Sequence, residues 1–162
     1  MLAVLMIAGG ILLRLTPHAA NFAPISATAL FGGTYLSKRF ALIVPLAAMA
    51  FSDYLLIYIY TFGSPVVYFS LIYPISAMFH TTTLYVWGSF MISGLIGIWI
   101  KKHMSPSNII LGSFLASVQF FLITNFGTWA GGMYSRELDG LLQSYIMGLP
   151  FFKWTLLGDL FY

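Results

Sequence analysis

The sequence predicts an all-α fold, a polytopic membrane protein built as a single transmembrane domain. Of the 162 residues 60% are apolar and 7% are charged, and the mean hydropathy is +0.92, whereas about 25% of the residues in a soluble domain are charged. Asp53 is the only charged residue between Arg39 and Lys101, and none lies between Lys102 and Arg136. The chain has too few charged residues to form the surface of a soluble protein. Soluble enzymes, nucleic-acid-binding proteins and disordered chains are therefore excluded.

Apolar runs bounded by charged or turn-forming residues mark the expected membrane segments. They are residues 1–13, 25–36, 40–60, 84–100, 109–130 and 149–162. The third and fifth runs suffice as helices to cross a hydrocarbon core of about 30 Å, and the fourth comes close to it. The first two extend only about 20 and 18 Å as helices. They are interpreted as thin spans, tilted spans or a re-entrant pair.

Two basic doublets, Lys38–Arg39 and Lys101–Lys102, decide which runs cross. Basic loops face the cytoplasm, so an even number of crossings must separate the doublets. The runs 40–60 and 84–100 supply two crossings, which leaves Val66–Phe79 as a segment that does not cross. This segment also contains Pro74 and extends only about 21 Å as a helix. We expect it to lie at the outer side or to be re-entrant, packed against protein.

Continuing this count gives about six crossings, with both termini in the cytoplasm. The segments 14–24 and 136–148 are then outside. A cleaved signal peptide is not expected, because no basic residue precedes the first apolar run. We expect one transmembrane domain over residues 1–162.

Small residues at helical spacing predict close helix packing, since lipid supplies no hydrophobic force between helices. They are Ser89, Ser93 and Gly97 on one helix, Gly112 with Ala116 and Ser113 with Ser117 on the next, and Ala41, Ala47, Ala48 and Ala50 in an earlier run. The short loop 101–108 joins the first two groups and predicts an antiparallel hairpin. The alanine run packs within the chain or faces a partner protein.

Two carboxylates, Asp53 and Asp159, lie in apolar runs. A charge at the centre of a bilayer costs about 2.5 to 3.5 kcal/mol on insertion scales. Each aspartate therefore needs a partner or a function. The structural interpretation is an ion pair or hydrogen bond, for example with Arg14 or Lys153, and the functional interpretation is a ligand-binding role.

Polar side chains from distant stretches are expected to meet at the outer side. Arg14, His18 and Asn21 belong to the first outer loop, and Asn125 and Trp129 end the fifth run. Small-molecule pockets combine aromatic walls with a few orienting polar groups. Trp129 also fits the role of an interfacial aromatic side chain.

No pattern in the chain indicates catalysis. There is no Cys, which excludes thiolate chemistry and disulfides. The residues around the two aspartates miss the motifs of intramembrane aspartyl proteases, and no Gly-x-Ser-x-Gly or Gly-rich phosphate loop is present. The histidines and aspartates lack metal-ligand spacing. We expect no enzyme activity, no cofactor, no metal and no nucleic acid partner.

Five stretches carry a family resemblance: residues 14–24, 29–33, 45–53, 124–129 and 150–159. They resemble a family of uncharacterised bacterial integral membrane proteins whose members are similar to the substrate-binding S components of energy-coupling-factor (ECF) transporters. The resemblance implies an S-component-like bundle of six helices with a ligand site near the outer face and a first outer loop that acts as a lid. It also implies a location in the bacterial plasma (inner) membrane, and a membrane-embedded coupling subunit and a pair of cytoplasmic ATPase subunits as partners.

Three functions remain open from the sequence. The first is capture of a small vitamin-like compound for uptake, with Arg14 pairing an anionic group, Asn21 and Asn125 orienting polar edges and Trp129 stacking. In this function Asp53 and Asp159 bind donors or hold the lid. The second is a non-catalytic accessory subunit of a larger membrane complex, in which the polar residues are structural. The third is a channel or proton-coupled carrier that uses the two aspartates as relay groups.

Overall fold

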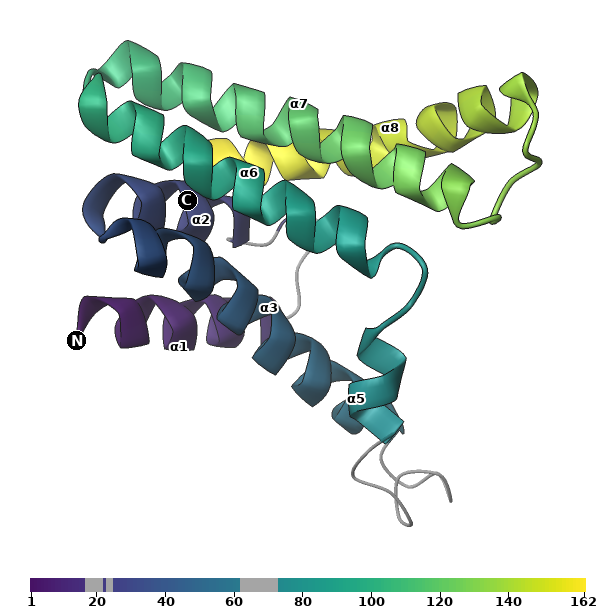
Figure 1. Cartoon of the computed structure of the whole chain (residues 1–162), viewed down its shortest axis with the longest axis horizontal. Coiled ribbons are helices and arrows are strands. Elements are labelled where there is room, and N and C mark those ends of the chain that lie inside the picture. Colours follow the sequence, from purple (N-terminus) through teal and green to yellow (C-terminus); the bar gives the residue numbers. More distant parts are fainter. Residues whose placement is uncertain (17–21, 23–24, 62–72) are drawn as a thin grey trace.

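The structure is a computed structural model that describes residues 1–16, 22, 25–61 and 73–162, and within them it contains helices and no strand. The helices are α1 (Leu2–Leu15), α2 (Ile25–Tyr35), α3 (Lys38–Thr61), α5 (Tyr73–Met78), α6 (Thr83–Lys102), α7 (Pro106–Ala130) and α8 (Leu138–Phe161) (Figure 1). The predicted all-α class is confirmed. Of the segment Val66–Phe79 only residues 73–79 are described, and there α5 has six residues.

Three of the described helices, α3, α6 and α7, are long and apolar enough to cross a membrane, fewer than the six crossings predicted. The helices α1 and α2 have 14 and 11 residues and extend about 21 and 17 Å. Helix α8 has 24 residues, enough in length, but Asp139, Lys153 and Asp159 interrupt its apolar sequence. The described helices thus comprise three that are long and apolar enough to span a membrane, three shorter ones (α1, α2 and α5) and one long, partly polar helix.

The last helix begins earlier than predicted. The sequence predicts an outer loop over 136–148 and a helix from Leu149, whereas α8 already begins at Leu138 and contains Pro150. Leucine, isoleucine and methionine recur between residues 138 and 147 among polar side chains, so the first three turns are helical without being continuously apolar. The loop between α7 and α8 is correspondingly shorter than predicted.

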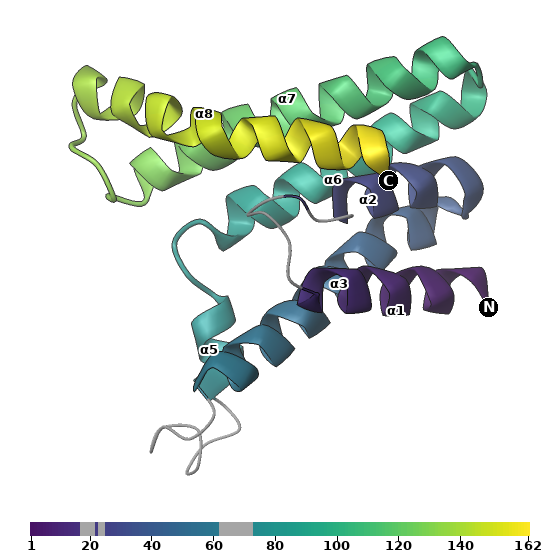
Figure 2. The same cartoon turned by 180° about the vertical axis from the view of Figure 1, so that it is seen from behind.

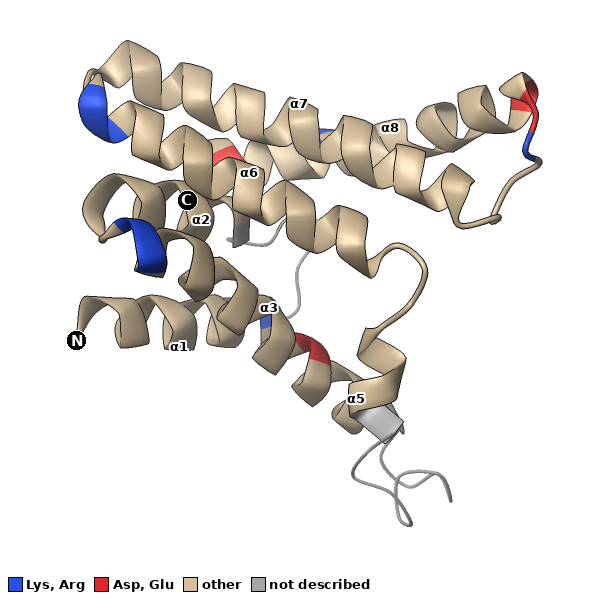
Figure 3. Ribbon diagram, viewed as in Figure 1, with Lys and Arg blue, Asp and Glu red and all other residues tan. Residues whose placement is uncertain are grey.

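The helices α6, α7 and α8 lie together on one side of the bundle, and α1 and α3 lie on the other (Figures 1 and 2). Both basic doublets lie at the same end of this bundle (Figure 3). Lys101 Nζ donates a hydrogen bond to the carbonyl oxygen of Leu36 at 3.1 Å, which joins the end of α6 to the loop before α3. The sidedness inferred from the doublets therefore agrees with the fold, and we call this the basic end.

Helix α2 is the centre of the bundle, in contact with α1, α3, α6, α7 and α8. Its closest neighbour is α6, where a Cβ on Gly97 would meet the carbonyl oxygen of Leu30 and a Cβ on Gly33 would meet that of Gly94. Thr34 also donates its hydroxyl to the carbonyl oxygen of Gly97 at 3.2 Å. A short helix with two glycines is thus held by backbone-to-backbone packing rather than by helix propensity.

Helices α6 and α7 form the antiparallel hairpin that the sequence predicts. Ser105 caps α7 by accepting a hydrogen bond from the Asn108 N–H at 3.2 Å. Between the helices, Gln119 Nε2 donates to the carbonyl oxygen of Ser89 and to the hydroxyl of Ser93, both at 3.0 Å. The small residues of α6 therefore contact two different helices. Ser89 and Ser93 lie against α7, and Gly97 lies against α2.

Candidate functional site

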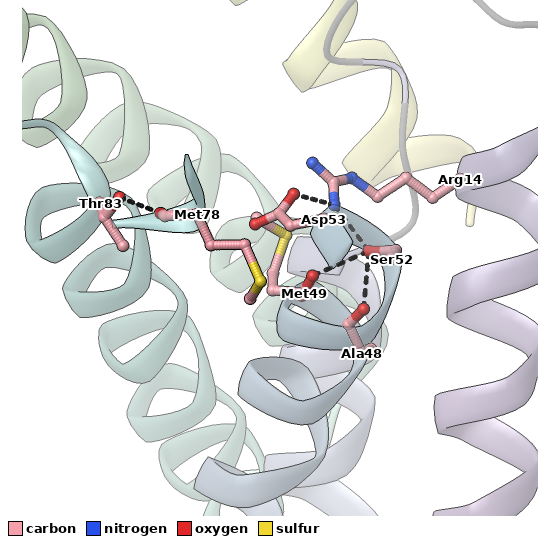
Figure 4. A network of polar contacts seen from close by, with 7 residues as sticks. All are labelled: Arg14, Ala48, Met49, Ser52, Asp53, Met78 and Thr83. Carbon is pink, nitrogen blue, oxygen red and sulfur yellow. Dashed lines mark hydrogen bonds and ion pairs between the residues drawn. The ribbon is translucent and has the colours of Figure 1, made fainter. Parts of the chain in front are cut away.

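An ion pair joins the end of α1 to the middle of α3 (Figure 4). Arg14 Nη1 lies 2.5 Å from Asp53 Oδ1 and donates to the hydroxyl of Ser52 at 2.6 Å. Ser52 is fully buried, and its hydroxyl in turn donates to the carbonyl oxygens of Ala48 and Met49. The two charged side chains keep 20% of their surface exposed. The structural interpretation of Asp53, an ion pair with Arg14, is present in the fold.

This ion pair lies within the helical bundle rather than in an outer loop. Arg14 was expected in the segment 14–24 outside the membrane, but it occupies the last turn of α1. The helix ends only at Thr16, whose extended φ of −74° and ψ of 147° fits a residue that precedes a proline. Asp53 lies about 22 Å along α3 from the basic end and about two turns from the end of α3, as predicted. The pair therefore lies in the half of the bundle away from the basic end.

A cavity of about 240 Å³ opens beside the pair, and we call it the ion-pair cavity. Its lining brings six helices and one connecting segment together: Arg14, Ser26, Met49, Asp53, His80, Thr83, Val86, Trp87, Phe90, Phe120 and Thr155. The wall combines three aromatic rings with two opposite charges, an imidazole and three hydroxyl groups. This is the composition of a site that encloses a small polar molecule and orients it through a few groups.

The ion pair between Arg14 and Asp53 determines the net charge of the molecule that the cavity can bind. The contacts with described residues use Nη1 of Arg14 and one oxygen of Asp53. A guanidinium carries five N–H donors and a carboxylate two acceptor oxygens, so donors and an acceptor remain at the cavity wall. Because the two charges compensate each other, a simple anion would have to displace Asp53. The cavity suits a dipolar or neutral molecule that offers both an acceptor and a donor.

Asn125 lies in a different cavity, of about 320 Å³, formed mainly by α7 and α8. Its Nδ2 donates to the carbonyl oxygen of Phe121 within its own helix at 2.8 Å, and its backbone carbonyl accepts the Ser144 hydroxyl at 2.6 Å. Phe120 and Thr155 line both this cavity and the ion-pair cavity, and so form the wall between them. The structure places Asn125 next to the ion-pair site but not in it.

Trp129 is not among the residues that line these cavities. Its ring packs against Phe126 with centroids 5.4 Å apart. Its buried Nε1 has no acceptor among the described residues. Trp129 therefore does not line the ion-pair cavity, where Trp87 and Phe90 contribute to the aromatic wall.

Asp159 lies about six turns into α8, because α8 begins at Leu138. A helix that began at Leu149, as the apolar run 149–162 predicted, would place Asp159 only about three turns in. Its side chain is only 4% exposed. One carboxylate oxygen accepts the hydroxyl of Ser117 on α7 at 2.7 Å, and Ser26 on α2 also hydrogen-bonds to this carboxyl. It borders a third cavity, of about 330 Å³, together with Ser113, Thr34 and Tyr35. We call this the basic-end cavity.

Two of the predicted site residues, His18 and Asn21, lie outside the described residues. Within the described part of the chain no group of three or more His, Cys, Asp and Glu side chains could hold a metal ion. Arg14 and Asp53 are thus the predicted site residues that the fold brings together.

Sequence reasoning missed several of the wall residues. Thr83, Trp87 and Phe90 lie in an apolar run in which no single position stands out. Ser117 was assigned to helix packing by its spacing from Ser113, and its hydroxyl also binds Asp159. An intramembrane aspartate implies nearby hydroxyl partners, which is the signal that could have found it.

Comparison with known proteins places the whole chain in one family. A family model described as a family of unknown function, DUF6580, matches residues 1–162. Neither a curated protein nor a solved structure matches the chain.

Proposed function

Since this chain belongs to DUF6580, a family of unknown function, over its full length, we propose its function from its own residues: it captures a small molecule for uptake across the membrane. The site is the ion-pair cavity, and the molecule is a small vitamin-like compound. The proposal includes a bundle of six membrane segments in a bacterial plasma membrane, with both termini in the cytoplasm.

One observation supports the proposal most strongly, the meeting of Arg14 and Asp53 at a cavity with aromatic walls. The two residues are 39 positions apart in the sequence, and both belong to stretches that resemble the membrane protein family. A purely structural ion pair satisfies itself and needs no cavity beside it. Here about 240 Å³ of space adjoins the pair, which is room for a compound of about one aromatic ring with a few polar substituents.

Uptake against a gradient requires an energy source, and the sequence contains no nucleotide-binding motif. The resemblance to S components supports a membrane-embedded coupling subunit and ATPase subunits as partners. Purification in a mild detergent tests this part of the proposal. Recovery of ATPase subunits with the chain supports it, whereas recovery of a respiratory or photosynthetic assembly supports an accessory subunit instead.

Ligand screening tests the capture function directly. Purified protein is screened by thermal shift against vitamins and their precursors, ordered by charge. We expect stabilisation by a dipolar or neutral compound. The affinity for this compound should be at least tenfold weaker in Trp87→Leu, which removes part of the aromatic wall, and in Asp53→Asn, which removes the carboxylate acceptor. Such a loss corresponds to about 1.4 kcal/mol.

The matched control is Asp139→Asn, which removes an exposed carboxylate at the start of α8. Its Kd should equal that of the unchanged protein. The capture function fails if no compound stabilises the protein, or if the cavity variants bind the stabilising compound as tightly as the control does.

A further inference from the structure

We propose that Asp159 is a proton-binding residue that connects the basic-end cavity with the ion-pair cavity. This function goes beyond ligand capture and does not depend on it. It separates the roles of the two intramembrane aspartates: Asp53 stays paired with Arg14, and Asp159 takes up and releases a proton.

Among the residues that the structure describes, the helices packed against Asp159 hold no compensating charge. The described elements packed against α8 are α7 and α2, and neither contains Asp, Glu, Lys, Arg or His. On α8 itself the nearest charged residue is Lys153, six positions away. The titratable groups that face the same cavity are the phenols of Tyr35 and Tyr162. An unpaired carboxylate that is 4% exposed is costly in such surroundings, and a bound proton removes that cost.

Hydroxyl groups lead from Asp159 in both directions. Toward the basic end, Ser117 bonds both to Asp159 at 2.7 Å and to the carbonyl oxygen of Ser113 at 3.1 Å, and Ser113 lines the basic-end cavity with Asp159. Toward the other side, Ser26 bonds to the carboxyl and lines the ion-pair cavity. Asp159 thus separates two cavities by the width of one hydrogen-bonded side chain.

Both cavities are large enough for water. A buried water needs about 10–15 Å³ of accessible volume, and the two cavities offer about 330 and 240 Å³. The transfer is then a simple exchange. A hydronium ion in the basic-end cavity gives its proton to a carboxylate oxygen of Asp159, which forms a carboxylic acid and leaves a water. The acid later returns the proton, through the hydroxyl of Ser26, to a water in the ion-pair cavity.

The depth of Asp159 fits a relay between the two sides. Its partner Ser117 lies about 16 Å along α7 from the basic end, and Ser26 lies about 14 Å along α2 from the same end. Both depths are close to half of a hydrocarbon core of about 30 Å. The carboxyl is therefore near mid-depth, with one cavity toward each side.

Two measurements on the full chain in lipid vesicles test the proposal. Infrared difference spectra between high and low pH should show a carboxylic acid C=O band that titrates in the unchanged protein and is absent in Asp159→Asn. Vesicles that contain a trapped pH dye and an imposed potassium diffusion potential should show proton entry above that of protein-free vesicles. Asp159→Asn should lower this entry at least tenfold, whereas the exposed Asp139→Asn should leave it unchanged.

Several outcomes overturn the proposal. They are the absence of proton entry in the unchanged protein, equal entry in the Asn variants at 159 and 139, and a carboxyl band at Asp159 that does not respond to pH. A flux that disappears when choline replaces Na⁺ also overturns it, because the ion is then Na⁺. If Asp159→Asn does not fold, Ser26→Ala decides the question. It removes the hydroxyl on the path to the ion-pair cavity, and unchanged proton entry in that variant contradicts the relay.

Discussion

Replacing Gly97 by alanine is expected to destabilise the protein by about 3 kcal/mol. The added Cβ would meet the carbonyl oxygen of Leu30 and lie 2.9 Å from the Cα of Gly33, which are backbone atoms of α2. Backbone atoms in two packed helices cannot turn aside as the end of a side chain can, so α2 would have to move off α6. Unfolding in mixed detergent micelles, followed by helical circular dichroism, measures the loss of stability.

Gly88 provides a matched control on the same helix. A Cβ at Gly88 has no atom within 4 Å, so Gly88→Ala should leave stability unchanged or raise it by a few tenths of a kcal/mol through better helix propensity. Equal stability of the two alanine variants would show that α2 does not pack on α6 as closely as the structure indicates.

Loss of Arg14 is expected to have the second large effect. Arg14→Gln leaves the carboxylate of Asp53 without its cation, which costs about 3–5 kcal/mol for a fully buried pair. Since each side chain is 20% exposed, we expect about 2–3 kcal/mol. The double variant Arg14→Gln with Asp53→Asn should be more stable than Arg14→Gln alone, because it leaves no unpaired charge.

Arg39→Gln is the control for the loss of a basic side chain, because Arg39 is exposed at the start of α3. Its stability should remain within about 0.5 kcal/mol of the unchanged protein. If the changes in unfolding free energy caused by the substitutions at 14 and 53 simply add in the same micelles, the two side chains do not stabilise each other.

The composition and residue pattern were sufficient to predict the fold class and part of the helix arrangement, but not the number of membrane spans, since three described helices rather than six are long and apolar enough to cross. They predicted the all-α fold, the α6–α7 hairpin and the placement of both basic doublets at one end, because each of these depends on local patterns or on the compartment of lysine and arginine. The chain belongs to DUF6580, a family of unknown function, over residues 1–162, and nothing links this family to the S components that the resemblance implied.

The rest depends on contacts between distant residues. Spacing alone showed that Gly97 belongs to a packed stripe, but not that its neighbour is α2, because small residues mark close approach without identifying the partner. The start of α8 was missed because its first turns mix polar and apolar residues, and apolar length was the criterion used for a span. The different surroundings of Asp53 and Asp159 follow from which helices meet them.

The bond between Arg14 and Asp53 also has a consequence for biogenesis. During synthesis, Arg14 is made 39 residues before its partner, which takes roughly 2–8 s at ordinary translation rates. Through that interval the guanidinium has no carboxylate to meet, and entering lipid alone would cost about 2.5–3.5 kcal/mol. We therefore expect that the first helix does not remain stably inserted on its own when it leaves the translocon. It should insert together with the third helix, so that the N-terminal third of the chain enters the bilayer as one unit.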